Sequence, residues 1–149
     1  MKSESINILL ADDEENDRLL FLDALKELKI KTIVHTVSDG VELMEYLSNS
    51  GNSLPHLLFL DINMPRKNGH ECLKEIKAND GLKDITIAIF STSMAEKDIE
   101  ETFINGANVF INKPNSFDKL KEVVQRVVTT VYTYENMFFN KSHFLLRVN

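Results

Sequence analysis

Two kinds of hydrophobic pattern alternate along the chain. Short unbroken runs of apolar residues are typical of strands that are buried on both faces of a parallel sheet. Between them lie longer segments in which apolar residues recur every three or four positions, which is the spacing of an amphipathic helix. The runs predict strands over residues 6–11, 32–37, 57–60, 85–90 and 109–112.

The helical segments follow these strands in turn. Ser93 and Glu96 have the spacing of a capping box for the fourth helix, and Ser116 can cap the fifth. The fourth helix has only a thin apolar stripe. The predicted helices and their apolar positions are residues 16–28 with Phe21, Ala24, Leu25 and Leu28; a segment after Asp39-Gly40 with Val41, Met44 and Leu47; a segment from Gly69 with Cys72, Leu73 and Ile76; a segment with Ile99 and Phe103; and a segment ending near Val131 with Leu120, Val123, Val124, Val127 and Val128.

Alternation of five strands with five helices predicts the fold class. It gives a parallel sheet with helices on both faces, because each crossover connection must be right-handed. The predicted class is α/β, a flavodoxin-like doubly wound sheet with strand order 2-1-3-4-5. At 149 residues the chain has the size of one domain, expected over residues 1–131. A C-terminal extension over residues 132–149 is too short for an output domain.

Net charge, cysteine content and the absence of long apolar segments exclude several classes of function. The formal net charge is −6, and no basic run is present, which argues against binding of nucleic acid. Cys72 is the single cysteine, so an intramolecular disulfide is impossible, and no zinc-type spacing of Cys and His occurs. The start of the chain lacks the apolar core of a signal peptide, and no run is long enough to span a membrane. A cytoplasmic location is expected.

Chemistry-bearing side chains follow four of the five predicted strands. Asp12 and Asp13 follow the first, Asp61 the third, Ser91 the fourth and Lys113 the fifth. In a doubly wound sheet, ligands bind at the carboxyl ends of the strands. Taken singly, each residue has a simpler explanation as a helix-opening acid, a cap, a turn residue or a solvated lysine. Their joint placement predicts one shared site.

The residue types indicate what such a site can do. Three clustered carboxylates repel one another, so a cation is expected, and Mg²⁺ suits a site with few carboxylates, several waters and a phosphate oxygen. A carboxylate can act as a nucleophile and hold a phosphoryl group as an acyl phosphate. Lys113 can neutralise charge, Ser91 can donate a hydrogen bond to a phosphoryl oxygen, and the Asn63 backbone carbonyl can act as a third metal ligand.

The ordered set of motifs over residues 6 to 131 resembles the response-regulator receiver domain of two-component signalling. Within that family, the turn over residues 65–69 and the Ser91-Thr92-Ser93 run look like the small stand-alone receivers paired with bacterial phytochromes. The matching pieces are Leu10-Ala11-Asp12-Asp13-Glu14, Leu60-Asp61-Ile62-Asn63-Met64-Pro65 with Gly69, Ser91-Thr92-Ser93, and Gly106-Ala107-Asn108-Val109-Phe110-Ile111-Asn112-Lys113-Pro114.

The resemblance implies a role for each matched residue. By this resemblance, Asp61 is the phosphoacceptor. Asp13 binds Mg²⁺ directly, and Asp12 binds it through a water molecule. Ser91 takes the position of the switch hydroxyl, where the family often has Thr, and Phe110 that of the switch aromatic.

It also implies partners and a type of activity. The implied partner is a sensor histidine kinase, for example one of the phytochrome type, or a phosphotransfer protein. The protein is not expected to be an enzyme beyond phosphorylation and dephosphorylation of its own Asp61. In the family, the peptide bond between Lys113 and Pro114 is usually cis.

Two alternatives remain open at this point. A phosphatase of the haloacid dehalogenase type also uses an aspartyl nucleophile and magnesium. Such enzymes carry a second Asp two residues after the nucleophile, where this chain has Asn63, and their nucleophile follows the first strand. A degenerate receiver that acts only as a docking module is the other alternative, and the intact acidic, hydroxyl and lysine set argues against it.

The C-terminal extension is too apolar to be disordered by composition. Its side chains must be covered, either by folding back over the domain or in a symmetric homodimer. We expect a homodimer through the fifth helix, or through the face of the fourth helix and fifth strand, together with the extension. The apolar residues concerned are Tyr132, Tyr134, Phe138, Phe139, Phe144, Leu145 and Leu146.

Overall fold

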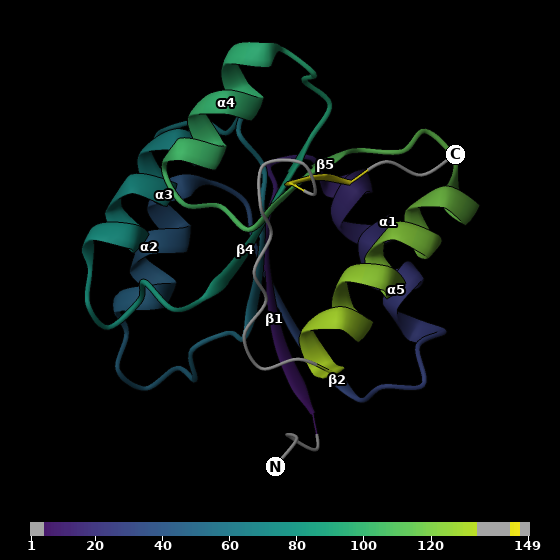
Figure 1. The fold of residues 1–149 in the computed structure, drawn as a ribbon. Helices are drawn as coiled ribbons and strands as arrows, with labels where there is room; N and C mark the ends of the chain where they lie inside the picture. The colour runs from purple at the N-terminus through teal and green to yellow at the C-terminus, as the bar shows by residue number, and fades with distance from the viewer. Residues whose placement is uncertain (1–4, 134–143, 147–149) are drawn as a thin grey trace.

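The computed structural model describes residues 5–133 and 144–146. Its centre is a parallel sheet whose strands stand in the order β2-β1-β3-β4-β5-β6 (Figure 1). The predicted order 2-1-3-4-5 is therefore confirmed, and a short sixth strand from the C-terminal extension adds to its edge. The strands are β1 (Ile6–Ala11), β2 (Thr32–Val37), β3 (Leu57–Leu60), β4 (Thr86–Ser91), β5 (Val109–Asn112) and β6 (Leu145–Leu146).

Five helices cover the two faces of this sheet. In Figure 1, α2, α3 and α4 lie on one side and α1 and α5 on the other. No helix among the described residues is long and apolar enough to cross a membrane. The helices are α1 (Glu15–Lys26), α2 (Gly40–Ser48), α3 (Gly69–Ala78), α4 (Glu96–Ile104) and α5 (Phe117–Thr133).

The central strand β3 shows why the sheet forms where it does. Side chains alternate between the faces of a strand, and all four residues of β3 are buried. Leu57 and Phe59 belong to the core beneath α1 and α5, whereas Leu58 and Leu60 belong to the core beneath α2 and α3. An unbroken apolar run is therefore required, and it delivers Asp61 to the carboxyl end of the central strand.

Local details of two helices differ from the prediction. Asp39 caps α2 by accepting a hydrogen bond from the Glu42 N–H, so the helix begins at Gly40 and buries Leu43 and Leu47. Of the predicted face, Leu47 is buried, Met44 is partly buried and packs against the core, and Val41 is partly exposed, while Leu43, which was not predicted, is fully buried.

The predicted capping box at α4 is also wrong. The N-cap is Ala95, and its side chain makes no capping bond. Ser93 lies two residues earlier, and its hydroxyl donates to Asp98 Oδ2 at 2.8 Å. Ser116 does cap α5, accepting a hydrogen bond from the Lys119 N–H at 3.3 Å. Every peptide bond among the described residues is trans, so the cis bond that the resemblance implied before Pro114 is absent from this structure.

The described part of the C-terminal extension lies on the domain itself. Helix α5 continues to Thr133, and β6 pairs in parallel with β5, opposite Phe110 and Ile111. Phe144 is buried, with its ring centroid 5.2 Å from that of Phe103 in α4 and 6.2 Å from that of Phe110. Of the two ways in which the extension could be covered, residues 144–146 therefore follow the first: they fold back over their own domain. Tyr134, Phe138 and Phe139 lie outside the described residues.

Candidate functional site

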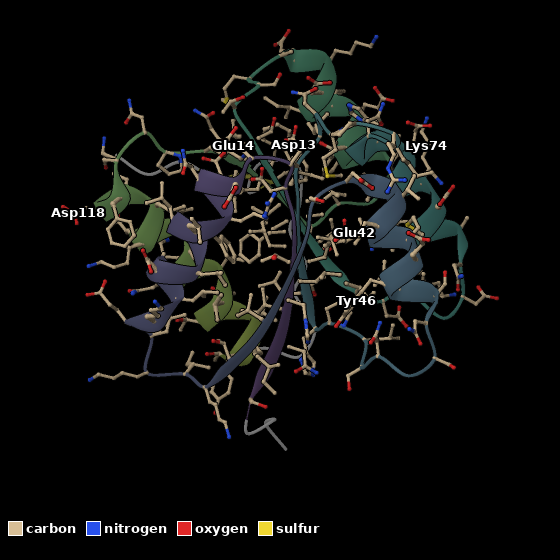
Figure 2. The ribbon with its side chains drawn as sticks, turned by 180° about the vertical axis from the view of Figure 1, so that it is seen from behind. Asp13, Glu14, Glu42, Tyr46, Lys74 and Asp118 are labelled. Carbon is tan, nitrogen blue, oxygen red and sulfur yellow. The ribbon has the colours of Figure 1, made fainter. Side chains whose placement is uncertain are left out.

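The predicted site residues come together at the carboxyl edge of the sheet. The Asp12 and Asp61 N–H groups donate to Val37 and Ala11 carbonyls, so both residues continue the ladder one position beyond β1 and β3. Asp12, Asp61 and Ser91 are buried, whereas Asp13 is exposed. Figure 2, which views the sheet from behind, labels Asp13 at this edge.

Three carboxylates form a group that can hold a metal ion. Asp12, Asp13 and Asp61 each offer one oxygen, and these oxygens lie within 4.8 Å of one another. Asp12 Oδ2 is buried and has no partner with hydrogen-bond geometry, although the Lys113 ammonium lies 2.8 Å away. A buried oxygen with a free lone pair, beside two other carboxylates, fits a hard cation such as Mg²⁺.

The Lys113 ammonium sits beside this group. Its Nζ lies 2.8 Å from Asp12 Oδ2, 3.0 Å from Asp17 Oδ2 and 3.2 Å from Asp61 Oδ2, and its side chain is 10% exposed. The contact with Asp12 is an ion pair without hydrogen-bond geometry, while those with Asp17 and Asp61 are hydrogen bonds. The Lys113 N–H also donates to the Ser91 carbonyl at 2.8 Å, which fixes the root of the side chain.

Burial and charge compete in setting the ionisation of these groups. Burial raises the pKa of Asp61 to about 6, although Lys113 opposes the shift. Burial also raises the pKa of Asp12. For Lys113, burial alone lowers the pKa, but the carboxylates of Asp12 and Asp61 outweigh it and leave the pKa raised. The lysine therefore stays charged. Without a metal ion, burial makes the ionised form of Asp61 energetically unfavourable.

The remaining predicted residues lie around this centre. Ser91 is fully buried, and its Oγ accepts a hydrogen bond from the Ser93 N–H at 3.1 Å. The Asn63 N–H donates to Asp61 Oδ1 at 3.2 Å, so the chain turns directly over the carboxylate. Phe110 is fully buried one strand away, against Phe144.

One residue of the site was missed by the sequence reasoning. Asp17 lies in the first turn of α1 and contacts Lys113, although the two residues are 96 positions apart. The available signal was its position four residues after Asp13, which places both on one side of a predicted helix start. That spacing alone is common among solvated helix faces.

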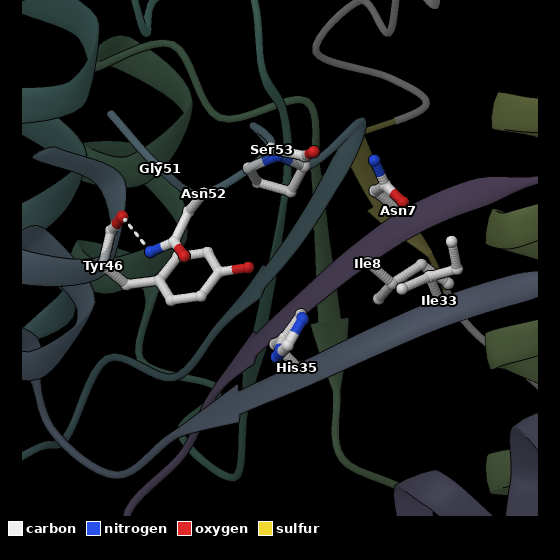
Figure 3. A pocket seen from close by; sticks show the side chains of 9 residues that line it. Asn7, Ile8, Ile33, His35, Tyr46, Gly51, Asn52 and Ser53 are labelled. Atoms are coloured by element: carbon white, nitrogen blue, oxygen red, sulfur yellow. Dashed lines mark hydrogen bonds between the residues drawn. The ribbon is translucent and has the colours of Figure 1, made fainter. Parts of the chain in front are cut away.

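A separate cavity of about 230 Å³ is shown in Figure 3. It is built from the beginning of β1, from β2 and from the end of α2 with the loop that follows, and it includes the His35 and Tyr46 rings with centroids 5.4 Å apart. None of its nine lining residues is acidic, so it offers no second site for the cation and phosphoryl chemistry argued above.

Comparison with known proteins agrees with this geometry. The model of the response regulator receiver domain family matches residues 8–125. The response regulator Rcp1 of Synechocystis is 32% identical over 124 residues, covering 80% of this chain and 84% of that protein. A probable methanogenesis regulatory protein of Methanothrix harundinacea, FilR2, is 31% identical over 123 residues, covering 80% of this chain and 79% of that protein.

Solved structures show the same likeness. The phosphorylated cyanobacterial phytochrome response regulator RcpA superimposes with a TM-score of 0.81 at 31% identity, over 91% of this chain and 99% of that one. The Mn²⁺-bound form of Rcp1 superimposes with a TM-score of 0.78 at 29% identity, with the same coverage of both chains. With the sheet order, the acidic group and Lys113 in place, the chain belongs to the response regulator receiver domain family.

Proposed function

We propose that this protein is a single-domain response regulator that accepts a phosphoryl group on Asp61, with Mg²⁺ bound, and then changes its partner-binding face. One observation carries the proposal. The Asp61 carboxylate offers an oxygen within 4.8 Å of oxygens of Asp12 and Asp13, and it lies 3.2 Å from the Lys113 ammonium. A carboxylate nucleophile, a cation site and a fixed ammonium are the parts that phosphoryl transfer needs.

Each residue has a defined part in the transfer. An Asp61 oxygen forms the new bond to phosphorus, while the bond from phosphorus to the donor breaks and its electron pair stays on the leaving group. When bound at Asp12, Asp13, Asp61 and the Asn63 carbonyl, Mg²⁺ neutralises charge on the transferring group. Lys113, which follows β5, supplies a second positive charge, and the Ser91 hydroxyl is proposed to donate to a phosphoryl oxygen.

The two alternatives are less well supported. A phosphatase of the haloacid dehalogenase type needs a general acid where Asn63 stands, and an amide cannot transfer that proton. Asp61 also follows the third strand of the sheet. Burying carboxylates beside a lysine costs desolvation energy. A degenerate receiver that is never phosphorylated would gain nothing in return for the contact between Lys113 and Asp61.

The first prediction concerns phosphorylation. Incubation with acetyl phosphate and Mg²⁺ is expected to add one phosphoryl group to the protein, and chelation of the metal is expected to prevent the addition. Intact mass spectrometry measures both. Asp61→Asn is expected to remain unmodified, whereas Asp23→Asn, an exposed acid of α1 paired with Lys26, serves as the matched control. Equal labelling of Asp61→Asn and the parent contradicts the proposal.

The switch is proposed to run from Asp61 through Ser91 and Phe110 to α4. A phosphoryl group brings about −1.5 to −2 charges and new acceptor oxygens, which draw Ser91 toward Asp61. Of the α4 side chains, only Thr102 is buried, so this helix can shift at low cost. Polar contacts also hold α4 in its present position. Asp98 in this helix accepts a hydrogen bond from the Ser93 hydroxyl and lies 2.9 Å from His70 Nε2.

The second prediction tests this route. Addition of a beryllofluoride phosphate mimic is expected to shift the backbone amide resonances of Ser91, of Phe110 and of α4 together. Heteronuclear NMR of the labelled protein measures the shifts, and Asp61→Asn provides a background in which they are lost. Changes confined to the loops that carry Asp13 and Asn63 contradict the proposed route.

The proposed phosphodonor is a sensor histidine kinase of the phytochrome type or a phosphotransfer protein, in the cytoplasm. The support is the likeness to RcpA and Rcp1, of which RcpA is described as a phytochrome response regulator. The acidic net charge of −6 supports a protein partner over nucleic acid.

We also propose a homodimer that uses α5 or the α4–β5 face together with the C-terminal extension. Phe144 and β6 already occupy the β5 edge, and the same strand of a second copy can make the same contacts. Exposed Ile104 at the end of α4 and Phe117 at the start of α5 leave apolar surface for a partner.

The third prediction tests the dimer. Sedimentation velocity at tens of micromolar is expected to show a dimer for the full chain and a monomer for a chain that ends at Thr133. The full chain with the phosphate mimic is the second condition, because phosphorylation is proposed to change this face. A full chain that sediments as a monomer in both conditions leaves the extension as an intramolecular cover and refutes the dimer.

A further inference from the structure

Lys113 has three carboxylate neighbours, and they are not equivalent. Asp12 and Asp61 come from the sheet and belong to the group that can hold a metal ion. Asp17 comes from α1, lies outside that group, and is 35% exposed. Its Oδ2 accepts a hydrogen bond from Lys113 Nζ at 3.0 Å, so one of the three ammonium N–H groups is directed toward the helix.

This arrangement makes a metal ion and the Lys113 ammonium compete for the same carboxylates. A metal ion and the ammonium both draw on the carboxylates of Asp12 and Asp61. Two positive groups at such distances also repel each other strongly in a partly buried site. A bound cation would therefore push the Lys113 ammonium away from Asp61, the residue that is proposed to carry the phosphoryl group. Asp17 is the one of the three carboxylate partners that is outside the metal-binding group.

Helix α1 holds Asp17 in this place through its buried face. Phe21 lies one helical turn after Asp17 and is fully buried, with its ring centroid 4.7 Å from that of Phe59 and 6.1 Å from that of Phe90. Lys113 Nζ lies 5.5 Å from the centroid of the same Phe90 ring. The helix face that packs on the aromatic core thus carries Asp17 directly to the lysine.

We propose that Asp17 is a positioning residue, which anchors the Lys113 ammonium so that a divalent cation and the lysine can occupy the site together. The proposal rests on the proposed function. Asp17 forms and breaks no covalent bond and moves no proton: the phosphoryl group passes between the donor and Asp61, and Asp17 acts only through Lys113. Without it, Lys113 has only the metal ligands as partners and competes with the cation for them.

The test measures metal binding and phosphorylation in a set of matched variants. Binding of Mn²⁺ alone is followed by the electron paramagnetic resonance signal of the free ion, and phosphorylation by intact mass with acetyl phosphate at saturating Mg²⁺. Asp17→Asn is expected to weaken Mn²⁺ binding roughly three- to tenfold, as coupled charged neighbours do, and to slow phosphorylation. Asp17→Glu is expected to restore most of both, and Asp23→Asn to change neither.

A lysine-free background separates anchoring from simple attraction between Asp17 and the metal. In Lys113→Met, adding Asp17→Asn is expected to change Mn²⁺ binding by less than about twofold, because the residue through which Asp17 acts is gone. An equal loss with and without Lys113, or no loss in the parent, overturns the proposal. If the parent binds Mn²⁺ but never gains a phosphoryl group, the proposed function fails instead, and the binding data still decide the role of Asp17.

Discussion

Replacing Lys113 with methionine is expected to lower the free energy of unfolding of the metal-free protein by roughly 3 kcal/mol at pH 7, the cost of breaking a buried ion pair from one side. The ammonium lies within 3.2 Å of three carboxylates, two of which belong to residues that are no more than 5% exposed. Methionine has a similar volume, so the change is mainly one of charge. Urea unfolding of the two proteins measures the difference.

Mg²⁺ provides the internal check on this prediction. A cation at Asp12, Asp13 and Asp61 replaces the lost positive charge, so saturating Mg²⁺ is expected to recover much of the stability of Lys113→Met. Lys121→Met is the control, because Lys121 pairs with the half-exposed Glu27 at 3.0 Å and such surface pairs contribute little. Equal losses for the two variants, or a loss at position 113 that Mg²⁺ leaves untouched, contradict the electrostatic account.

The stability of the metal-free protein is expected to fall as the pH rises from about 4 to about 6. Burial raises the pKa of Asp61 from 3.8 to about 6, so in this window the folded state binds more protons than the unfolded state. The contribution is present below pH 3.8 and is lost as the pH rises through the folded pKa. A shift of about two pH units corresponds to about 3 kcal/mol. The raised pKa of Asp12 acts in the same direction.

Asp61→Asn isolates this effect. The amide keeps the shape of the side chain and cannot ionise, so the variant is expected to be the more stable protein at pH 7 and to show a flatter profile between pH 4 and 6. The lowered pKa values of Asp39 and Asp98 act below pH 3.8 and are common to both proteins, so they cancel. Denaturant midpoints across the pH range measure the difference, and parallel profiles for the two proteins count against a strained Asp61.

Residues whose surroundings are set by the chain itself were predicted correctly. The run before Asp61 is apolar at every position, which is typical of a strand buried on both faces, and the carboxyl ends of parallel strands meet at one edge of the sheet. Asp12, Asp61 and Lys113 were therefore placed together from sequence alone. The valine stripe of α5 was equally informative, because six of its apolar side chains are buried.

Residues whose role depends on how elements meet were not predicted. Asp17 reaches Lys113 only because α1 packs Phe21 against Phe59 and Phe90. The apolar spacing predicted the buried face of α1, but it did not predict which side chain at the strand ends the first turn of the helix would meet. Ser93 had the spacing of a capping box, but its hydroxyl bonds to Asp98 instead. The sequence predicted that Phe144 is buried. It did not predict whether the burying surface belongs to the same chain or to a second copy, because that depends on the relative free energies of the folded-back and dimeric arrangements.

The most direct measurement of the central claim identifies the phosphorylated carboxylate in the unaltered protein. Borohydride reduces an acyl phosphate and converts the modified aspartate to homoserine, which peptide mass spectrometry then locates. After incubation with acetyl phosphate and Mg²⁺, homoserine is expected at position 61 and at neither position 12 nor position 13, although all three carboxylates offer oxygens within 4.8 Å of one another. Homoserine at position 12 or 13, or at none of the three after metal-dependent labelling, contradicts the assignment of Asp61 as the phosphoacceptor.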